Sequence, residues 1–210
     1  MTVAVQASLI DDLVDEPQLG ELGATVRRTR LTRGAWVDVR RGWVSAPTAL
    51  FDLLSAGVPW HAERREMYDR EVDVPRLLSF YDEGAPLPHP LLTDARDRLG
   101  RYYAAELREP FVTAGLCLYR DGRDSVAWHG DTVGRSRTED TMVAIVSVGS
   151  PRALLLRPRG GGQALKLMLG HGDLIVMGGS CQRTWEHAVP KTAQPVGPRI
   201  SIQFRPHNVR

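Results

Sequence analysis

The sequence His129-Gly130-Asp131 places two side chains that can bind a metal ion two positions apart. It ends an apolar run that begins near Ser125, and this run predicts a strand over residues 125–131. Side chains two positions apart in a strand point to the same face, so the imidazole and the carboxylate can bind one ion together. Such a triplet also occurs by chance, and an exposed His and Asp remain the alternative on this spacing alone.

A third ligand would turn this pair into a metal site of a known kind. Two histidines and one carboxylate on one face of an octahedron hold the iron of non-haem oxygenases and leave three positions open. His61, His89 and His207 lie in Pro-rich, charged or terminal surroundings, and His171 lies in a predicted tight turn. His187 comes late in the β-rich part of the chain, where a returning strand could face the first. The pattern alone leaves the third ligand open among these histidines.

The C-terminal residues 199–205 alternate completely between polar and apolar side chains. One face carries Ile200, Ile202 and Phe204, and the other carries Arg199, Ser201, Gln203 and Arg205. An antiparallel strand with a solvated outer face gives this pattern. Two arginines and a serine on one face can also bind a dicarboxylate, because arginine forms paired hydrogen bonds with a carboxylate and a hydroxyl adds another. In that case the polar face lines a pocket.

The elements that would position these side chains fall into two parts. Upstream, the sequence predicts a strand or hairpin over 36–44, a helix over 47–56, irregular structure over 59–90 and an amphipathic helix over 91–108. From residue 111, short β-rich runs separated by Gly, Pro and Asp predict strands at 111–119, 125–131, 142–148, 152–157, 164–169, 173–177 and 199–205. This order predicts one α+β domain with a jelly-roll core and N-terminal helices packed on one sheet.

The composition is that of a globular protein of one domain. The 210 residues are 42% hydrophobic and carry a net charge of +2, which excludes a disordered chain and a polycation. We treat the acidic residues 1–25 as an N-terminal arm. No apolar run reaches membrane-spanning length and the first residues lack a basic start, so we expect a cytoplasmic protein that does not enter a membrane. Cys117 and Cys181 are expected to be reduced thiols.

Taken in order, these motifs resemble those of the AlkB family of Fe(II)- and 2-oxoglutarate-dependent nucleic-acid dealkylases. The resemblance runs over roughly residues 35–206 and is carried by HGD (129–131), WEH ending at His187, and RISIQFR (199–205). LYRDG (118–122), GHGDL (170–174) and HAVPK (187–191) support it, and PW (59–60), PRL (75–77) and FY (80–81) are similar to the family's nucleotide-recognition region. It implies a dioxygenase domain over 26–210, with a helical and nucleotide-recognition region over 26–110 and a double-stranded β-helix core over 111–210.

The resemblance implies an iron site and an oxidative reaction. His129, Asp131 and His187 would bind Fe(II), and these three residues with Arg199 form the expected catalytic set. O2 and 2-oxoglutarate would be the cosubstrates, and conversion of 2-oxoglutarate to succinate would be coupled to hydroxylation of an N-methyl group on a base. The hydroxylated group would leave as formaldehyde. The metal would supply this chemistry, while the protein would supply geometry and a dry pocket.

The resemblance also implies how the cosubstrate binds. Arg199 would pair with the distal carboxylate of 2-oxoglutarate, with help from Tyr119 and Ser201, and Arg205 would lie near the carboxylate end that chelates iron. The chain departs from the family at two positions where asparagine is common. Cys117 stands two positions before the tyrosine, and Ser201 stands at the other position.

The implied partner is alkylated DNA or RNA, bound by a monomer, because a base must be unpaired or flipped out of a duplex to reach such a site. By resemblance, Tyr81 would stack on the base and Arg76 and Met67 would also contact substrate, with Trp60 and Tyr68 nearby in sequence. Packing of the aromatic side chains between helices and sheet is the alternative. Candidate phosphate contacts, each of which could also be a solvated surface residue, are Arg76, Arg135, Arg137, Arg157 and Arg159.

One further departure keeps other functions open. The dealkylases often carry acids just after HxD that help to read the base, whereas here Asp131 is followed by Thr132-Val133-Gly134, with Glu139 and Asp140 later. The alternatives are a 2-oxoglutarate oxygenase of the same fold that acts on a protein or a small molecule, and a non-catalytic binding module. The complete set of HxD, distal histidine and Arg-x-Ser argues against the module, since binding alone needs none of them together.

Overall fold

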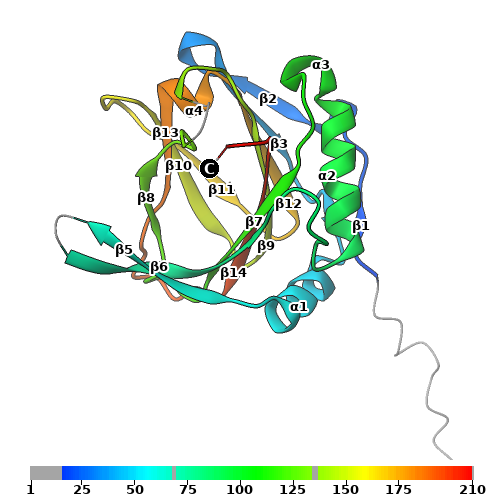
Figure 1. The fold of residues 1–210 in the computed structure, drawn as a ribbon, viewed down its shortest axis with the longest axis vertical. Helices are drawn as coiled ribbons and strands as arrows, with labels where there is room; N and C mark the ends of the chain where they lie inside the picture. The colour runs from blue at the N-terminus through cyan, green and yellow to red at the C-terminus, as the bar shows by residue number, and fades with distance from the viewer. Residues whose placement is uncertain (1–15, 68–69, 134–136, 210) are drawn as a thin grey trace, which may run out of the picture.

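Two antiparallel sheets face each other and form the body of the molecule (Figure 1). The computed structural model describes residues 16–67, 70–133 and 137–209, with only the backbone described over 64–67 and 70–73. The larger sheet has the strand order β2 (Arg27–Arg30), β3 (Ala35–Arg40), β12 (Asp173–Gly179), β9 (Val143–Gly149), β14 (Arg199–Arg205), β7 (Thr113–Tyr119), β6 (Arg70–Tyr81) and β5 (His61–Met67). The smaller sheet has the order β11 (Leu165–Leu169), β10 (Arg152–Pro158), β13 (Trp185–Val189) and β8 (Val126–His129).

Alternating side chains give the larger sheet two different faces. In β14, Ile200, Ile202 and Phe204 join a core cluster on the helix side, whereas Arg199 and Ser201 line the space between the sheets. Strands β9 and β12 alternate in the same way, and their inward residues pack with the smaller sheet in a second core cluster. Period-two alternation therefore builds both cores at once. The predicted jelly-roll core is confirmed.

Helices cover the outer face of the larger sheet, on the right of Figure 1. Leu50 and Leu54 recur at helical spacing in the first helix and pack into the helix-side cluster, and Leu92, Ala95 and Leu99 do the same in the second. The predicted packing of the helices on one sheet is confirmed. The helix predicted over 91–108 divides after Tyr102 into two. The bounds are α1 (Pro47–Gly57), α2 (Pro90–Tyr102), α3 (Ala104–Leu107) and α4 (Cys181–Thr184), with two 3-10 turns at Gly23–Thr25 and Thr32–Gly34.

A long hairpin stands where irregular structure was predicted over residues 59–90. Strands β5 and β6 pair with each other, and β6 joins the sheet by pairing Leu77–Tyr81 with β7. Pro75 is accommodated because it lies where the β5–β6 register shifts, between the pairs of Ala62 and Arg64, so no ladder hydrogen bond is lost there. The prediction was wrong because an edge ribbon needs no alternating apolar residues, and alternation is the signal that reveals a strand.

The described end of the predicted N-terminal arm is attached to the fold. Residues 1–15 lie outside the described part of the chain. Strand β1 (Gln18–Leu19) pairs with β4 (Val44–Ser45), and Leu19 packs against the helix-side cluster. Within the described residues, no helix combines the length and the apolar character needed to cross a membrane.

Candidate active site

A cavity of about 510 Å³ lies between the two sheets. Strands β5, β6, β7, β9 and β14 provide its wall on the larger sheet, and β8, β10 and β13 provide its wall on the smaller one. The lining includes every residue of the polar face of β14, namely Arg199, Ser201, Gln203 and Arg205. The polar face recognised in the sequence therefore lines a pocket instead of meeting solvent.

Three side chains in this cavity can bind a metal ion together. His129, Asp131 and His187 each offer one ligand atom, and these atoms all lie within 4.8 Å of one another. His129 and His187 are opposite each other in the antiparallel β8–β13 pair, with ring centroids 4.2 Å apart. Strand β8 ends at His129, and a turn in which Thr132 N donates to Gly130 O at 2.8 Å carries Asp131 to the same place. The predicted strand was thus two residues too long, because this turn replaces its end.

Hydrogen bonding and burial keep both imidazoles in a form that can bind a metal. His129 Nδ1 lies 2.9 Å from Ala127 O, which places the proton on Nδ1 and leaves the lone pair on Nε2. That Nε2 lies 3.8 Å from Asp131 Oδ1. Burial, followed by the neighbouring His129, lowers the pKa of His187 to about 3, so this ring is neutral at physiological pH.

Asp131 is held in place from two sides. Its backbone N–H donates to Gln182 Oε1 at 3.0 Å, and Arg205 Nε donates to Asp131 Oδ2 at 3.1 Å. Burial by itself would raise the pKa of this carboxyl, but the guanidinium of Arg205, together with the two neighbouring imidazole rings, outweighs burial and holds the pKa well below its usual range. The carboxylate therefore stays ionised, as a metal ligand must.

The histidines that competed for the third ligand position lie elsewhere. His171 Nδ1 accepts a hydrogen bond from Gly149 N at 2.7 Å, His89 caps α2, and His207 lies 2.9 Å from Glu83 Oε2. Within the described residues, no other group of three His, Cys, Asp or Glu side chains comes close enough to share an ion. The structure thus brings together the three ligands that the sequence resemblance implied.

Arg199 is a buried arginine with an unused donor. Its side chain is 2% exposed, and its Nε donates to Ser147 Oγ at 2.8 Å, while Nη1 has no partner among the described residues. Its guanidinium carbon lies 5.2 Å from the ring centre of Tyr119. Burial lowers the pKa of Arg199, and burial raises the pKa of Tyr119 to about 12, so the tyrosine keeps its hydroxyl proton. A buried guanidinium beside a hydroxyl donor fits a carboxylate ligand.

The rest of the polar face of β14 forms one hydrogen-bonded row. Gln203 Nε2 donates to Ser201 Oγ at 3.3 Å and to Cys117 Sγ at 3.5 Å, and Arg205 Nη2 donates to Gln203 Oε1. This row connects Arg205, which contacts Asp131, to the hydroxyl of Ser201, which lies on the same face of β14 as Arg199. Cys117 takes part through its sulfur, which is a weak acceptor.

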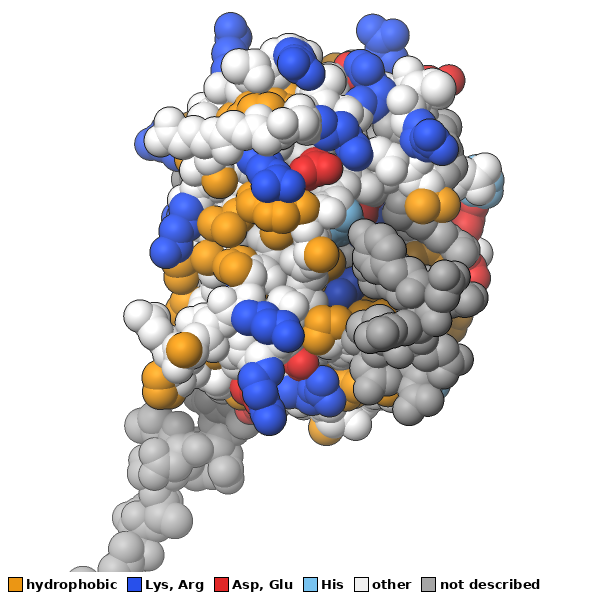
Figure 2. Space-filling model, turned by 90° about the vertical axis from the view of Figure 1, so that its left-hand side faces the viewer, with side chains coloured by type: hydrophobic (Ala, Val, Ile, Leu, Met, Phe, Trp, Pro, Cys, Tyr) orange, Lys and Arg blue, Asp and Glu red, His pale blue; other side chains and the backbone are white. Residues whose placement is uncertain are grey.

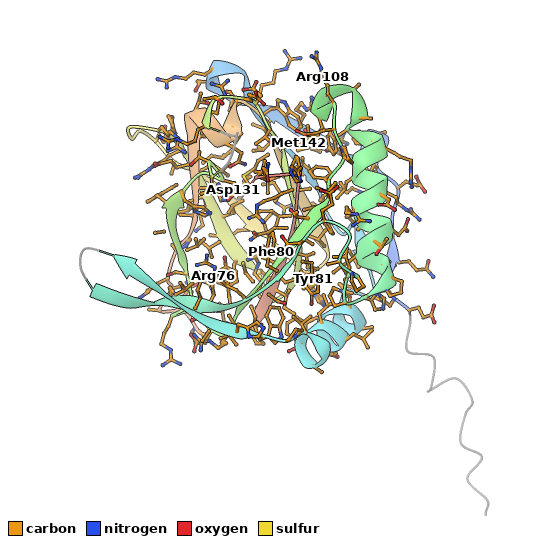
Figure 3. All side chains as sticks on the ribbon, in the orientation of Figure 1. Arg76, Phe80, Tyr81, Arg108, Asp131 and Met142 are labelled. Atoms are coloured by element: carbon orange, nitrogen blue, oxygen red, sulfur yellow. The ribbon has the colours of Figure 1, made fainter. Side chains whose placement is uncertain are left out.

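The aromatic side chain at the cavity is Phe80 rather than Tyr81. Phe80 lines the cavity and is 42% exposed, whereas Tyr81 packs against the helix-side cluster, as Trp60 does (Figure 3). Successive residues of a strand point to opposite faces, so one position decides between core and cavity. The structure therefore does not place Tyr81 where a base could stack on it. The side chain of Met67 lies outside the described residues.

Arg76 and Glu63 bring opposite charges to the side of the cavity formed by the β5–β6 hairpin. Arg76 Nη1 donates to Ser125 O at 3.2 Å, and its Nε has no partner among the described residues. Glu63 lies where the β5–β6 register shifts, opposite the segment of β6 between Asp73 and Leu77 that contains Arg76. Arg76, predicted to contact substrate, therefore lines the cavity, and its contact with substrate stays a prediction.

A second hollow, of about 580 Å³, adjoins the cavity and is lined mainly by arginines. Val133 lines both spaces, and Arg137, Arg159 and Arg183 line the hollow. Two of the predicted phosphate contacts, Arg137 and Arg159, therefore meet in one place. Figure 2 shows the face of the smaller sheet, where Lys and Arg side chains gather toward the upper end.

The other predicted phosphate contacts differ in position. Arg157 pairs with Glu186 at 3.2 Å and lies 4.1 Å over the ring of Trp128, and it does not line the hollow. Arg135 lies outside the described residues.

Sequence reasoning missed several residues of the site. Ser147 left a signal, since it is a single hydroxyl on the inward face of an otherwise apolar strand. Gln182 left none, because a four-residue helix carries no periodicity that shows where a side chain points. Phe80 was missed because its neighbour Tyr81 was chosen as the stacking residue. Glu63 was missed because its segment was predicted to be irregular.

Comparisons with known proteins agree with this geometry. Residues 59–205 match the sequence model of the 2OG-Fe(II) oxygenase superfamily. The human alpha-ketoglutarate-dependent dioxygenase alkB homolog 3 is 30% identical over 195 residues, which cover 81% of this chain and 63% of that protein. The DNA oxidative demethylase ALKBH2 of Arabidopsis thaliana is 34% identical over 193 residues, which cover 74% of this chain and 60% of that protein. The chain thus spans less than two thirds of the length of these relatives.

Solved structures share the fold at low sequence identity. The structure of OsALKBH1 superposes with a TM-score of 0.59 at 15% identity and covers 86% of this chain and 100% of that one. An oxidoreductase of the 2OG-Fe(II) oxygenase family from Burkholderia pseudomallei superposes with a TM-score of 0.52 at 14% identity, over 77% of this chain and 80% of that one. At these identities, the likeness shows the fold alone.

Proposed function

The chain belongs to the 2OG-Fe(II) oxygenase superfamily and, within it, to the AlkB family, and from this premise we propose that it is a dioxygenase that demethylates N-alkylated bases in DNA or RNA. Its cofactors are Fe(II), 2-oxoglutarate and O2. One observation carries the proposal. A cluster of two histidines and a carboxylate shares a cavity with a buried arginine that has a donor to spare.

The donor set of His129, Asp131 and His187 fits Fe(II). Two imidazoles and one ionised carboxylate are the ligands of the facial triad, which leaves positions open for cosubstrate and O2. When bound, Fe(II) would activate O2, of which one oxygen atom would convert 2-oxoglutarate to succinate and CO2 and the other would hydroxylate the N-methyl group of the base, which would then leave as formaldehyde. The contacts of Gln182 and Arg205 with Asp131 fix the direction in which its carboxylate points.

Arg199 fits the distal carboxylate of 2-oxoglutarate. Its unused Nη1 donor needs an acceptor, and a buried cation needs a counter-charge, so a carboxylate satisfies both. The hydroxyls of Tyr119 and Ser201 line the same cavity and can add hydrogen bonds. Arg205, already bonded to Asp131, lies on the metal side of the cavity and suits the other end of the cosubstrate.

The substrate side fits a nucleic acid with an unpaired base. Phe80 offers an exposed ring at the cavity for stacking, and this residue replaces Tyr81 in the proposal. The hollow lined by Arg137, Arg159 and Arg183 lies next to the cavity, where the phosphates that flank the base would pass. We extend the proposal to a monomer that acts on single strands or flipped bases.

Formaldehyde release from 1-methyladenine or 3-methylcytosine in single-stranded DNA and RNA tests the proposal. With Fe(II) and 2-oxoglutarate, the protein should release formaldehyde, and Asp131→Ala should abolish the release because the cluster loses its carboxylate. Asp97→Ala is the matched control, since Asp97 lies half-exposed on α2, on the helix side of the larger sheet.

The same assay separates the alternatives. Conversion of 2-oxoglutarate to succinate without formaldehyde from either nucleic acid would keep the dioxygenase and reject the nucleic-acid substrate, in favour of a protein or small-molecule substrate. Neither activity, with metal bound by the wild type and not by Asp131→Ala, would reject catalysis and favour a binding module.

A further inference from the structure

Arg152 is a buried arginine that lies behind the wall of the cavity. It begins β10, and its side chain is 3% exposed. Leu154, two positions later on the same face of the strand, lines the cavity, whereas Arg152 does not. Arg152 therefore points between the two sheets without reaching the space where ligands would bind. It takes no part in the contacts described above, so its burial needs a separate explanation.

The guanidinium of Arg152 joins two segments of the chain at one end of the cavity. Its Nη1 donates to Asp121 O at 2.9 Å, and its Nη2 donates to Asp124 O at 2.9 Å and to Pro190 O at 2.8 Å. The two aspartates lie in the loop between β7 and β8, and the proline directly follows β13. Because the donors of arginine form a rigid fork, these three bonds fix the loop that begins directly after Tyr119.

The hydrogen bonds of Arg152 satisfy its donors but do not neutralise its charge. Its three acceptors are backbone carbonyls. The nearby carboxylate of Asp124 pairs with Arg120 at 2.8 Å, and that of Asp121 pairs with Arg123 at 2.7 Å. Burial lowers the pKa of Arg152 in spite of these two acids. A buried charge of this kind favours an anion in its neighbourhood.

Tyr119 lies near two buried guanidinium groups. The guanidinium carbon of Arg152 lies 5.7 Å from the centre of the Tyr119 ring, and that of Arg199 lies 5.2 Å from it. At these distances a cation is attracted to an aromatic ring. Burial lowers the pKa of Arg199, and the positive charge of Arg152 lowers it further, so the two charges repel each other. A carboxylate bound by Arg199 would offset this repulsion.

We propose that Arg152 is a positioning residue that holds Tyr119 beside Arg199, so that both side chains meet the distal carboxylate of 2-oxoglutarate. The inference rests on the proposed function, since it names the residue that orients part of that same site. Arg152 fixes the loop after Tyr119 through three carbonyls and attracts the ring of the tyrosine. Its effect should therefore be confined to the end of the cosubstrate that carries the distal carboxylate.

Arg152→Met tests this role with two ligands that differ only at the distal carboxylate. 2-Oxopentanoate has the chelating end of 2-oxoglutarate and a methyl group in place of the distal carboxylate. Calorimetric titration of the Mn(II)-loaded protein should show about tenfold weaker binding of 2-oxoglutarate, as expected for loss of one hydrogen bond to a charged group. The affinity for 2-oxopentanoate should stay as in the wild type. Arg101→Met, at an exposed position on α2, should change neither affinity.

A double-mutant cycle shows whether Arg152 acts through the tyrosine. In Tyr119→Phe, which already lacks the hydroxyl, Arg152→Met should weaken binding of 2-oxoglutarate by less than it does in the wild type. Equal losses in the two backgrounds would overturn the inference. An equal loss for both ligands in Arg152→Met, or no loss of affinity for 2-oxoglutarate, would overturn it as well. Selective loss supports it even if no formaldehyde is released from nucleic acid and the proposed function fails.

Hydrogen exchange of the wild type covers the case in which Arg152→Met does not fold. The loop that Arg152 holds has its own backbone bonds, from Asp124 N to Asp121 O at 3.3 Å and from Thr192 N to Gly122 O at 2.8 Å. Binding of 2-oxoglutarate to the Mn(II)-loaded protein should slow exchange of these amides, and 2-oxopentanoate should not. Equal protection by both ligands, or none by 2-oxoglutarate, would overturn the inference.

Discussion

At the scale of single residues, buried polar side chains hold the proposed ligand-binding residues of the cavity in place by hydrogen bonds. Gln182 is 1% exposed, its Oε1 accepts from Asp131 N at 3.0 Å, and its carbonyl accepts from Arg159 Nη2 at 3.2 Å. It touches no reacting group, so it is a positioning residue for the carboxylate of Asp131. Ser147 has the same relation to Arg199.

Gln182→Leu should weaken metal binding by roughly 10- to 100-fold, the usual effect of losing a residue that orients a ligand. The reason is that Asp131 N would be buried without an acceptor, and the loop would move to satisfy it. Titration of the metal-free protein with Co(II), followed by its visible absorption, measures the affinity. Gln194→Leu at an exposed position is the control, and equal affinities of the two variants would contradict the role.

Arg199→Met should abolish the stabilisation that 2-oxoglutarate gives to the folded protein. For the wild type, 2-oxoglutarate at about 100 times its Kd should raise the free energy of unfolding by about 2.7 kcal/mol. Thermal unfolding with Mn(II), with and without 2-oxoglutarate, measures the effect. Arg101→Met, at an exposed position on α2, should keep the wild-type shift. A normal shift in Arg199→Met would place the distal carboxylate elsewhere.

At the scale of elements, the sequence predicts the strands that carry the cofactors better than those that would carry substrate. The alternation in β14 and the inward polar residues of β7 reflect a sheet with an apolar outer face, so side-chain pattern and position agree. Strand β5 of the β5–β6 hairpin shows no such alternation in its sequence, and the strands of the hairpin were not predicted. Tyr81 was chosen over Phe80 because resemblance does not report to which side of a strand a residue points.

The packing of β3 against β12 is a second element-scale feature with a testable cost. A Cβ on Gly178 would overlap the ring of Trp36, which is stacked on Tyr103 with centroids 5.9 Å apart and carries the Arg28 guanidinium on its face. Gly178→Ala should therefore lower the free energy of unfolding by about 2 kcal/mol, measured by urea denaturation.

The matched control is a glycine with open space around it. A Cβ on Gly100, inside α2, meets nothing within 4 Å, so Gly100→Ala should raise the free energy of unfolding by roughly 0.5 to 1 kcal/mol. Equal effects of the two substitutions would show that the contact of β12 with Trp36 is not tight.

At the scale of the whole molecule, charge is distributed unevenly although the net charge is only +2. The hollow beside the cavity gathers the side chains of Arg137, Arg159 and Arg183 where, in the proposed function, a nucleic-acid backbone would pass. Replacing Arg137 and Arg183 together by Gln should weaken binding of single-stranded DNA and lower the slope of log K against log salt by about 0.7 for each lost phosphate contact. Anisotropy at several salt concentrations measures both.

The control for that pair is Arg27→Gln with Arg30→Gln, two exposed arginines on β2 at the far edge of the larger sheet. This pair carries the same change of net charge, so the overall field of the protein falls equally in both double variants. Equal loss of binding would mean that the protein attracts nucleic acid by its total charge and not through the hollow.

The position of β14 in the larger sheet has a consequence for folding during synthesis on the ribosome. This strand is made after both of its neighbours, β7 and β9, yet it lies between them. Until it emerges, those two strands each expose an unpaired edge, which invites aggregation. It also carries Arg199 and Arg205, so a chain cut short before this strand has neither a closed sheet nor the arginines of the cavity. Incomplete synthesis therefore leaves the cavity without the polar face of β14.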